Sequence, residues 1–382
     1  MKKRVALVRG PNLNSWEMQN FTPLMDAFEF VGFTSHRHNF DLATVPFPVK
    51  KLMSWGQLAT PRVIRKGFYR FLGDYHDLQG LTDVLDGFDI VHTTESFYYC
   101  SYQAGLAKRT RGFKLVVTVW ENIPFLFNLP ATQRLKQVIF NEADLFLATT
   151  GRAREVLMLE GAPPHKIRVQ MPGVDIEHFH PAPKDEQLLN RFGCAPDDTI
   201  VLFVAHLYVQ KGIFDLLFAL RRLLHNLKIS NIKLLIAGTG PEEQTVKSLV
   251  TRLGLQNNVR LIGRHPYSKM PSIHNLADVF VLPSQPSREW QEQFGYVLVE
   301  SMSCGKPVLS TTSGSIPEVV GDAGVLVPSA DFVSLGDALE HLVTSPEVRC
   351  ELGQKARQRA ETMFDSRKVA IHIKAHYESL FT

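Results

Sequence analysis

The stretch Ser284–Gly314 reads SQPSREWQEQFGYVLVESMSCGKPVLSTTSG, and its pattern is that of a loop followed by a helix and a buried strand. Gly305 is typical of the residue just past a helix C-terminus, and Pro307 beyond it prevents the helix from continuing. We therefore expect a helix over residues 295–304 and a short strand over residues 308–310.

One carboxylate, that of Glu300, interrupts the apolar body of this predicted helix, and an acid in apolar surroundings needs a partner. Helical side chains lean toward the N-terminus, so Glu300 points to the helix start, which Glu292 approaches from the loop. The free N–H groups at a helix start favour an anion, and Gly295, flanked by Phe294 and Tyr296, lets a phosphate approach the backbone. The stretch thus predicts a site for a diphosphate with a sugar on either side.

The spacing Glu292-x7-Glu300, the segment Glu292-Gln-Phe-Gly295 and the following Ser303-Cys-Gly-Lys-Pro307 resemble the signature of retaining glycosyltransferase family 4. The resemblance implies an α/β chain of the GT-B fold, with two Rossmann-like doubly wound domains facing across a cleft. It also implies that Glu292 contacts the donor sugar, that Glu300 contacts the nucleotide ribose, and that the sugar keeps its anomeric configuration.

Length and composition agree with two domains. The 382 residues are 45% hydrophobic, which suffices for two cores, and we place the domains at residues 1–182 and 183–364. The resemblance implies that a last helix, residues 365–382, returns to the first domain. The four cysteines form no CxxC pair, which favours a reducing cytoplasm. The short apolar run near the N-terminus predicts no signal peptide, and no stretch is long enough to span a membrane.

The net charge of +4 does not indicate a nucleic-acid partner. Residues 49–73 nevertheless combine basic side chains with aromatic ones and contain no acid. The basic residues are Lys50, Lys51, Arg62, Arg65, Lys66 and Arg70. This composition is typical of a peripheral contact with a membrane surface. The alternative is a solvated helix packed on the N-terminal domain.

The chain opens with a predicted strand over residues 4–8, then Gly10, then a predicted helix over residues 16–31. Because a glycine-containing turn between a strand and a helix is where a doubly wound sheet binds ligands, Gly10 is a candidate donor contact. Further apolar runs at residues 89–92, 115–119 and 145–148 predict a parallel sheet.

Polar clusters follow two of these runs, at residues 93–96 and 120–122. Open α/β sheets place their sites at such strand ends. Family members commonly have a His-Asp pair near the second cluster, where this chain has Trp120 and Glu121. Glu121 is therefore a candidate catalytic residue.

The second predicted domain starts with a strand over residues 199–204, followed by His206 and Lys211. The family has an arginine where His206 stands, and Lys211 matches the lysine that holds the donor phosphates. The resemblance also implies that Arg264, after a glycine-ended strand, meets the nucleotide base. Glu292, Lys211 and Glu121 are thus the predicted catalytic residues, and the others are predicted to bind the donor.

No two aspartates lie two residues apart, so the DxD metal motif is absent and the sequence predicts a reaction without a metal or other cofactor. The leading hypothesis is a hexosyl-type glycosyltransferase that uses a nucleotide-diphosphate sugar and a glycan, lipid-linked or small-molecule acceptor. A sugar-nucleotide epimerase or hydrolase of the same fold is one alternative. A non-catalytic sugar-nucleotide-binding protein is the other.

Overall fold

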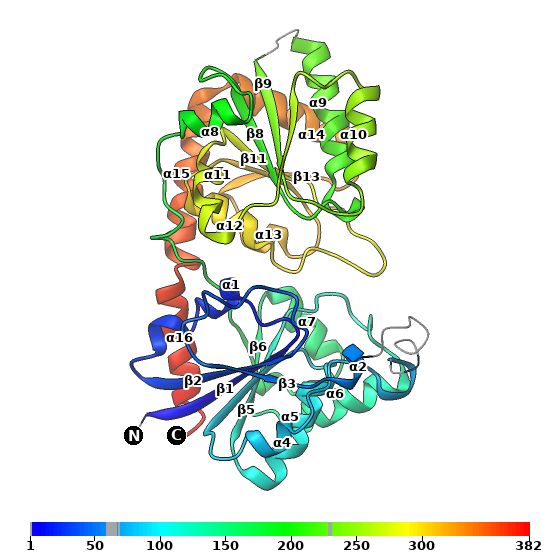
Figure 1. Cartoon of the computed structure of the whole chain (residues 1–382), viewed down its shortest axis with the longest axis vertical. Coiled ribbons are helices and arrows are strands. Elements are labelled where there is room, and N and C mark those ends of the chain that lie inside the picture. The colour runs from blue at the N-terminus through cyan, green and yellow to red at the C-terminus, as the bar shows by residue number, and fades with distance from the viewer. Residues whose placement is uncertain (1, 59–66, 68, 228–230) are drawn as a thin grey trace. The chain divides into compact units, whose positions relative to one another are not determined.

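The structure is a computed structural model that describes residues 2–58, 67, 69–227 and 231–382 (Figure 1). The chain divides into two compact units: unit 1 is Met1–Gly173 with Ser366–Thr382, and unit 2 is Val174–Asp365. The boundary expected after residue 182 thus lies too far along the chain. The reason is that the Val174 N–H donates to the Phe364 carbonyl at 2.7 Å, which ties this segment to the end of unit 2.

Unit 1 is built on a parallel sheet of seven described strands in the order β3-β2-β1-β4-β5-β6-β7. The strands are β1 Lys3–Gly10, β2 Phe28–Ser35, β3 Val49–Leu52, β4 Ile90–Thr94, β5 Lys114–Val119, β6 Leu145–Ala148 and β7 Ile167–Val169. The helices are α1 Ser15–Met18, α2 Trp55–Leu58, α4 Leu81–Val84, α5 Tyr99–Arg111, α6 Pro130–Glu142, α7 Gly151–Leu159 and α16 Ser366–Glu378, with 3-10 turns η1 Thr22–Leu24 and η2 Pro164–Lys166.

The sheet of unit 1 is buried on both faces, as its continuous apolar strands require. Along β1, Ala6 and Val8 belong to one hydrophobic core, whereas Val5 and Leu7 belong to the core on the opposite face. The side chains that α16 contributes to the second core include the fully buried Tyr377. In Figure 1 this helix, drawn in red, lies beside β1 and β2.

One local prediction for unit 1 and one of the alternatives are wrong. Residues 16–31 are not one helix, because the aromatic and β-branched run Phe28–Ser35 forms β2 and pairs in parallel with β1. Residues 49–73 are not one helix either, since Val49–Leu52 forms the strand β3 beside β2. Arg62, Arg65 and Lys66 of that segment lie outside the described residues.

Unit 2 is built on a parallel sheet of six described strands in the order β10-β9-β8-β11-β12-β13. The strands are β8 Thr199–Val204, β9 Ile232–Ala237, β10 Val259–Gly263, β11 Val279–Leu282, β12 Val308–Thr311 and β13 Gly324–Val327. The helices are α8 Glu186–Arg191, α9 Ile213–Leu227, α10 Glu243–Arg252, α11 Met270–Asn275, α12 Tyr296–Ser303, α13 Ile316–Val320, α14 Phe332–Thr344 and α15 Pro346–Met363, with 3-10 turns η3 Val209–Lys211 and η4 Tyr267–Lys269.

The expected helix and strand after the Glu292 loop are confirmed as α12 and β12. In both sheets the strand order reverses at the centre, between β1 and β4 in unit 1 and between β8 and β11 in unit 2. The carboxyl ends of the strands at such a switch point form the crevice where doubly wound sheets bind ligands. The loops after these four strands are therefore the places to look for a site.

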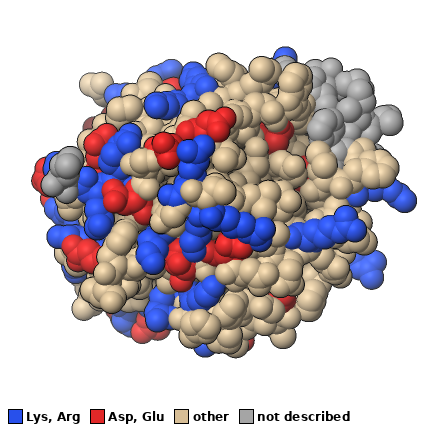
Figure 2. All heavy atoms as spheres, turned by 90° about the horizontal axis from the view of Figure 1, so that it is seen from below, with Lys and Arg blue, Asp and Glu red and all other residues tan. Residues whose placement is uncertain are grey.

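The surface mixes both signs of charge, in keeping with the small net charge. On the face shown in Figure 2, acidic side chains lie among the basic ones over much of the described surface. In the described part of the chain, no helix combines the length and the apolar character needed to cross a membrane.

Candidate active site

Lys211 and Glu292 meet where β8 and β11 end in unit 2. The Lys211 ammonium lies 2.8 Å from Glu292 Oε2, and the same oxygen accepts a hydrogen bond from Ser284 Oγ at 2.9 Å. The ammonium also lies 4.6 Å from the centre of the Trp290 ring. Glu292 is only 7% exposed, whereas the Lys211 side chain retains 23% of its surface. The structure thus brings two predicted catalytic residues together, with the cation as the more accessible partner.

Two glycines let the loops around this pair pack against each other. A Cβ on Gly212, where φ is +75°, would lie 1.8 Å from the Pro283 carbonyl oxygen. A Cβ on Gly314, where φ is +56°, would lie 2.2 Å from the carbonyl oxygen of Glu292. Because only glycine fits at such approaches, the backbones next to Lys211 and at Glu292 are held in place by direct packing.

The start of α12 follows directly on this pair. Gly295, at the N-cap position, has a φ of +81°, which turns the chain from the loop into the helix. Phe294 is 2% exposed, and its ring packs edge-on against Tyr296 at 5.2 Å and Phe364 at 5.7 Å. The structure therefore places Phe294 in the core beneath the helix start, while Tyr296 stays half-buried above it.

Glu300 has a buried partner on the neighbouring helix α11. Its Oε2 lies 3.3 Å from Nε2 of His274, which is fully buried. The other ring nitrogen of His274 has no hydrogen-bond partner among the described residues. The sequence predicted that Glu300 needs a partner but did not identify His274, because a single histidine 26 residues earlier carries no pattern that points to it.

His206 and Arg264 line one pocket at the carboxyl ends of β8 and β10, together with Val297 from the first turn of α12. The pocket has an empty volume of about 550 Å³. His265 also lines it, and its buried Nε2 has no partner among the described residues. Two predicted donor-binding residues therefore share a pocket, but Lys211 and Glu292 are not among the residues that line it.

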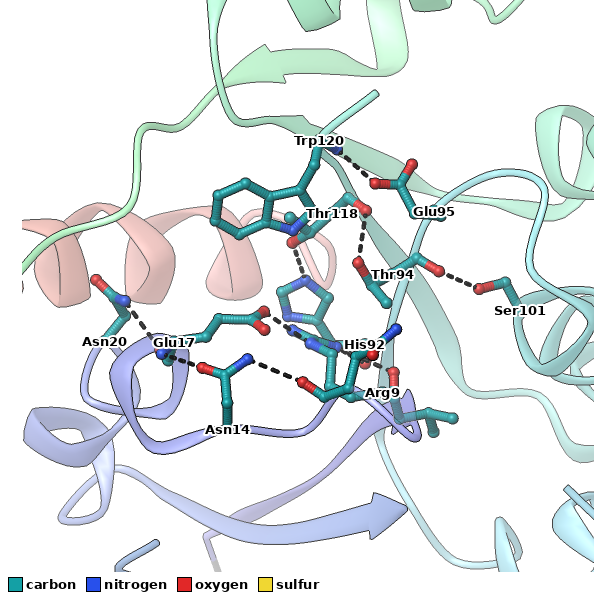
Figure 3. A network of polar contacts seen from close by, with 12 residues as sticks. Arg9, Asn14, Glu17, Asn20, His92, Thr94, Glu95, Ser101, Thr118 and Trp120 are labelled. Atoms are coloured by element: carbon teal, nitrogen blue, oxygen red, sulfur yellow. Dashed lines mark hydrogen bonds and ion pairs between the residues drawn. The ribbon is translucent and has the colours of Figure 1, made fainter. Parts of the chain in front are cut away.

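In unit 1, Gly10 ends β1 with a φ of +54°, and its carbonyl accepts a hydrogen bond from Thr34 Oγ1 at 2.7 Å. Arg9, the residue before it, is 1% exposed and pairs with Glu17 at 2.7 Å (Figure 3). Arg9 also donates to the His92 carbonyl at 2.7 Å. Sequence reasoning missed this buried network, because an arginine at a strand end is typical of a solvated residue.

His92 links three elements of unit 1. Its Nδ1 lies 2.6 Å from the Tyr377 hydroxyl of α16, and its Nε2 lies 2.7 Å from Thr118 Oγ1 of β5. Burial, assisted by the charge of Arg9, lowers the pKa of His92 well below its usual value. The ring is therefore neutral, and one nitrogen donates while the other accepts.

Glu121, the third predicted catalytic residue, lies in the loop after β5. It is 6% exposed, and its Oε1 accepts the backbone N–H groups of Asn122 and Ile123 at 2.9 and 2.7 Å. Burial raises its pKa. In the structure Glu121 therefore accepts hydrogen bonds from the backbone of its own loop. It lies in unit 1, whereas Lys211 and Glu292 lie in unit 2.

Glu95, at the end of β4, is a second carboxylate of this region, in a cluster that the sequence already marked as polar. It is a non-glycine residue with a φ of +60°, and its Oε1 accepts the Trp120 N–H at 3.0 Å (Figure 3). Its Oε2 is buried without a partner among the described residues. Burial, with the nearby charge of Glu121, raises the pKa of Glu95 to about 8. At neutral pH this side chain is therefore mainly a neutral acid.

Metal ligands do not gather in the parts of the chain that the structure describes. Within residues 2–58, 67, 69–227 and 231–382, no three His, Cys, Asp or Glu side chains are arranged to hold an ion.

Two family models match the chain. Residues 185–359 match the glycosyl transferases of group 1, and residues 32–178 match glycosyltransferase family 4. The chain is similar to a D-inositol 3-phosphate glycosyltransferase of Kribbella flavida, with 30% identity over 295 residues that cover 72% of this chain and 67% of that protein. An enzyme of the same name from Catenulispora acidiphila is 29% identical over 325 residues, which cover 78% of this chain and 74% of that one.

Solved structures show the same fold. HepE of Anabaena, determined with UDP, superposes with a TM-score of 0.81 at 19% identity and covers 99% of this chain and 100% of its own. A glycosyltransferase from Rickettsia africae superposes with a TM-score of 0.77 at 16% identity. The superposition covers 100% of this chain and 99% of that one. The two-domain Rossmann-like architecture of the GT-B fold is therefore confirmed.

Proposed function

This chain belongs to the glycosyltransferases of group 1 and family 4, which makes it a hexosyl glycosyltransferase of the GT-B type. From that premise we propose that it transfers a hexose from a nucleotide-diphosphate sugar to a hydroxyl group of an acceptor, with retention of configuration and without a metal. The observation that carries the proposal is the contact between Lys211 and Glu292.

The chemistry of the leaving group explains why this contact matters. Breaking the bond between the sugar and the diphosphate leaves negative charge on phosphate oxygens, so the enzyme needs preorganised positive groups there. The Lys211 ammonium is held by Glu292 and by the Trp290 ring, yet part of its surface is accessible. The N–H groups at the start of α12 and the exposed His206 are further donors within the same unit.

Glu292 has the complementary role in this proposal. One carboxylate oxygen is shared by Lys211 and Ser284, which fixes the position of the group. A carboxylate held in this way accepts hydrogen bonds from hydroxyl groups of the donor sugar. Glu300, one turn into α12 and paired with His274, is proposed to bind the ribose.

The nucleotide and the acceptor are proposed from the relatives. HepE of Anabaena was determined with UDP and with UDP-glucose, and the curated relatives are D-inositol 3-phosphate glycosyltransferases. We therefore take UDP-glucose as the first donor to test and small polyols or glycans as the first acceptors. The pocket that His206 and Arg264 line is the proposed place of the base, since Arg264 offers a planar group that stacks on a base.

The test is an assay of UDP release from UDP-glucose with a panel of acceptors, followed by analysis of the product. A new glycoside with the anomeric configuration of the donor supports the proposal. Free glucose as the sole product indicates a hydrolase, and a changed sugar nucleotide indicates an epimerase. Binding of UDP-glucose without any turnover across the panel indicates a non-catalytic protein.

Metal independence has its own test. Because Lys211 and the helix start supply the positive charge that a metal supplies in other transferases, we expect excess EDTA to leave the rate unchanged. A rate that falls with EDTA and recovers with Mg²⁺ or Mn²⁺ contradicts this part of the proposal.

A peripheral membrane contact is a second proposal, and exposed apolar side chains within residues 49–73 favour it. Phe71 is 77% exposed and Trp55 is 52% exposed, and Lys50 and Lys51 on β3 are exposed too. Each lysine near an anionic leaflet contributes about 1 kcal/mol. Lys50→Gln with Lys51→Gln should therefore weaken co-sedimentation with vesicles of anionic lipid. If the wild type stays in the supernatant at low salt, the contact is absent.

A further inference from the structure

Trp290 places an aromatic ring in the loop before α12, at a position that the sequence motif does not include. The side chain is half-buried, and the Lys211 ammonium lies 4.6 Å from the centre of its ring. The face of an indole carries negative electrostatic potential and attracts a cation, and tryptophan does so better than phenylalanine or tyrosine. Trp290 therefore holds the ammonium through its charge and not through a hydrogen bond.

The Lys211 ammonium keeps donor capacity for a further group. A lysine ammonium has three N–H donors and no acceptor. It donates to Glu292 Oε2 at 2.8 Å, and Nζ makes no other hydrogen bond to the described residues. Because the side chain also retains 23% of its surface, an anionic ligand can reach the unused donors.

Backbone hydrogen bonds support the contact between the ring and the ammonium. The Gln285 N–H donates to the Gln210 carbonyl at 2.7 Å, which joins the loop that carries Trp290 to the residue before Lys211. The Ser287 N–H donates to the Trp290 carbonyl at 2.7 Å and closes a turn at the indole. The two loops are thus tied together by their backbones on either side of this contact.

The charges of the site explain why a ring is useful here. In the proposed function Glu292 and the diphosphate are both negative, so the carboxylate alone would compete with the phosphates for the ammonium. The ring also attracts the ammonium, but it is neutral and adds no charge that repels the phosphates. It also limits the freedom of a lysine stem that has four flexible carbons.

We infer that Trp290 is a positioning residue for the donor diphosphate: its ring orders the Lys211 ammonium, and Lys211 contacts the phosphates. This inference rests on the proposed function, because it concerns the same donor site. Two consequences distinguish it from a purely structural role of Trp290. The effect of the side chain depends on its aromatic character, and it disappears when the cation is absent.

The first test measures the dissociation constant of UDP for the full-length protein by calorimetry. Trp290→Leu keeps an apolar side chain but removes the ring, so UDP should bind roughly 2- to 5-fold more weakly. Trp290→Phe keeps a weaker aromatic face, so its affinity should lie between those of the wild type and Trp290→Leu. Phe332→Leu, which removes an exposed ring from α14 in the same unit, should bind UDP as the wild type does.

The second test asks whether the ring acts through the lysine. In a protein that already carries Lys211→Met, the addition of Trp290→Leu should cause no further loss of UDP affinity. Uridine lacks the phosphates, so its binding, followed by saturation-transfer NMR, should be the same in the wild type and in Trp290→Leu. Thermal unfolding of each variant defines the temperature at which all of them are folded.

The outcomes separate this inference from the proposed function. Equal UDP affinities of the wild type and Trp290→Leu overturn the inference, as does the same loss of affinity with and without Lys211. A loss of affinity for uridine, or for UDP-glucose but not for UDP, shows that the ring contacts another part of the donor and also overturns it. These outcomes leave the proposed donor site intact. If the wild type does not bind UDP, the proposed donor and this inference are both wrong.

Discussion

Lys211 Nζ lies 2.8 Å from Glu292 Oε2, across 81 residues of sequence. The contact exists because β8 and β11 are neighbours at the centre of the unit 2 sheet, and their loops leave the same edge. In the proposed reaction, this cation supplies the group for the phosphates and this anion the group for the sugar.

Glu292→Gln should reduce kcat by about 100-fold or more and change the KM for the donor little, because the charge is proposed to act mainly during the reaction. Steady-state kinetics with UDP-glucose measure both constants. Glu289→Gln, an exposed position in the same loop, is the matched control and should behave as the wild type. Unchanged turnover in Glu292→Gln contradicts the assignment.

Lys211→Met should lower stability as well as activity, because Glu292 then remains buried without its cation. Adding Glu292→Gln to Lys211→Met should recover much of the lost stability, since the buried charge is gone, but should not restore turnover. Thermal unfolding and transfer assays on the two single variants and the double variant measure the coupling. Additive losses of stability show that the contact contributes nothing.

Glu300→Ala should weaken the binding of UDP-glucose and of free UDP by the same factor, roughly 10-fold, because the ribose is common to both. Calorimetry on both ligands measures the two factors. His274→Gln, which keeps a hydrogen-bonding side chain beside Glu300, should lose less affinity for both ligands than Glu300→Ala does. Loss of UDP-glucose binding alone would show that Glu300 contacts the sugar rather than the ribose.

His206→Arg should tighten the binding of UDP at pH 8, because a guanidinium is charged at every working pH whereas an imidazole is charged only when protonated. Calorimetric titration at pH 8 tests this. Identical affinities at pH 8 show that His206 does not face the diphosphate.

Glu95→Gln should change how stability depends on pH. Burial raises the pKa of Glu95 from 4.5 to about 8, so between these values the folded state binds more protons than the unfolded state does. The free energy of unfolding of the wild type therefore falls as pH rises through this window, by up to about 1.4 kcal/mol per pH unit from this group.

In Glu95→Gln that contribution is absent. The free energy of unfolding of the variant should therefore rise relative to that of the wild type as pH rises from about 5 to about 8. Urea denaturation at several pH values measures the difference. Glu29→Gln, at an exposed position on β2, is the control: its free energy of unfolding should depend on pH as that of the wild type does. A constant difference between Glu95→Gln and the wild type across the window shows that Glu95 is ionised throughout.

Strands were predicted best where the apolar run is continuous. The predicted strands 4–8 and 199–204 lie in β1 and β8, because buried parallel strands are continuous in their apolar character. The first half of the run Phe28–Ser35 falls within the helix predicted over residues 16–31, since a short apolar run has no period that separates the two structures. Only its pairing with β1 decides that it is a strand.

The sequence by itself determined the family and the fold class, and it singled out Lys211, Glu292 and Glu300 as candidate site residues, because local spacing carries the motif. Tertiary structure alone decided which side chains meet. It paired Glu300 with His274 and placed Phe294 in the core, and it brought Tyr98 onto the ring of His76. The physical reason is that a parallel sheet joins strand ends that are far apart in the chain, and no local pattern records which side chains those ends bring into contact.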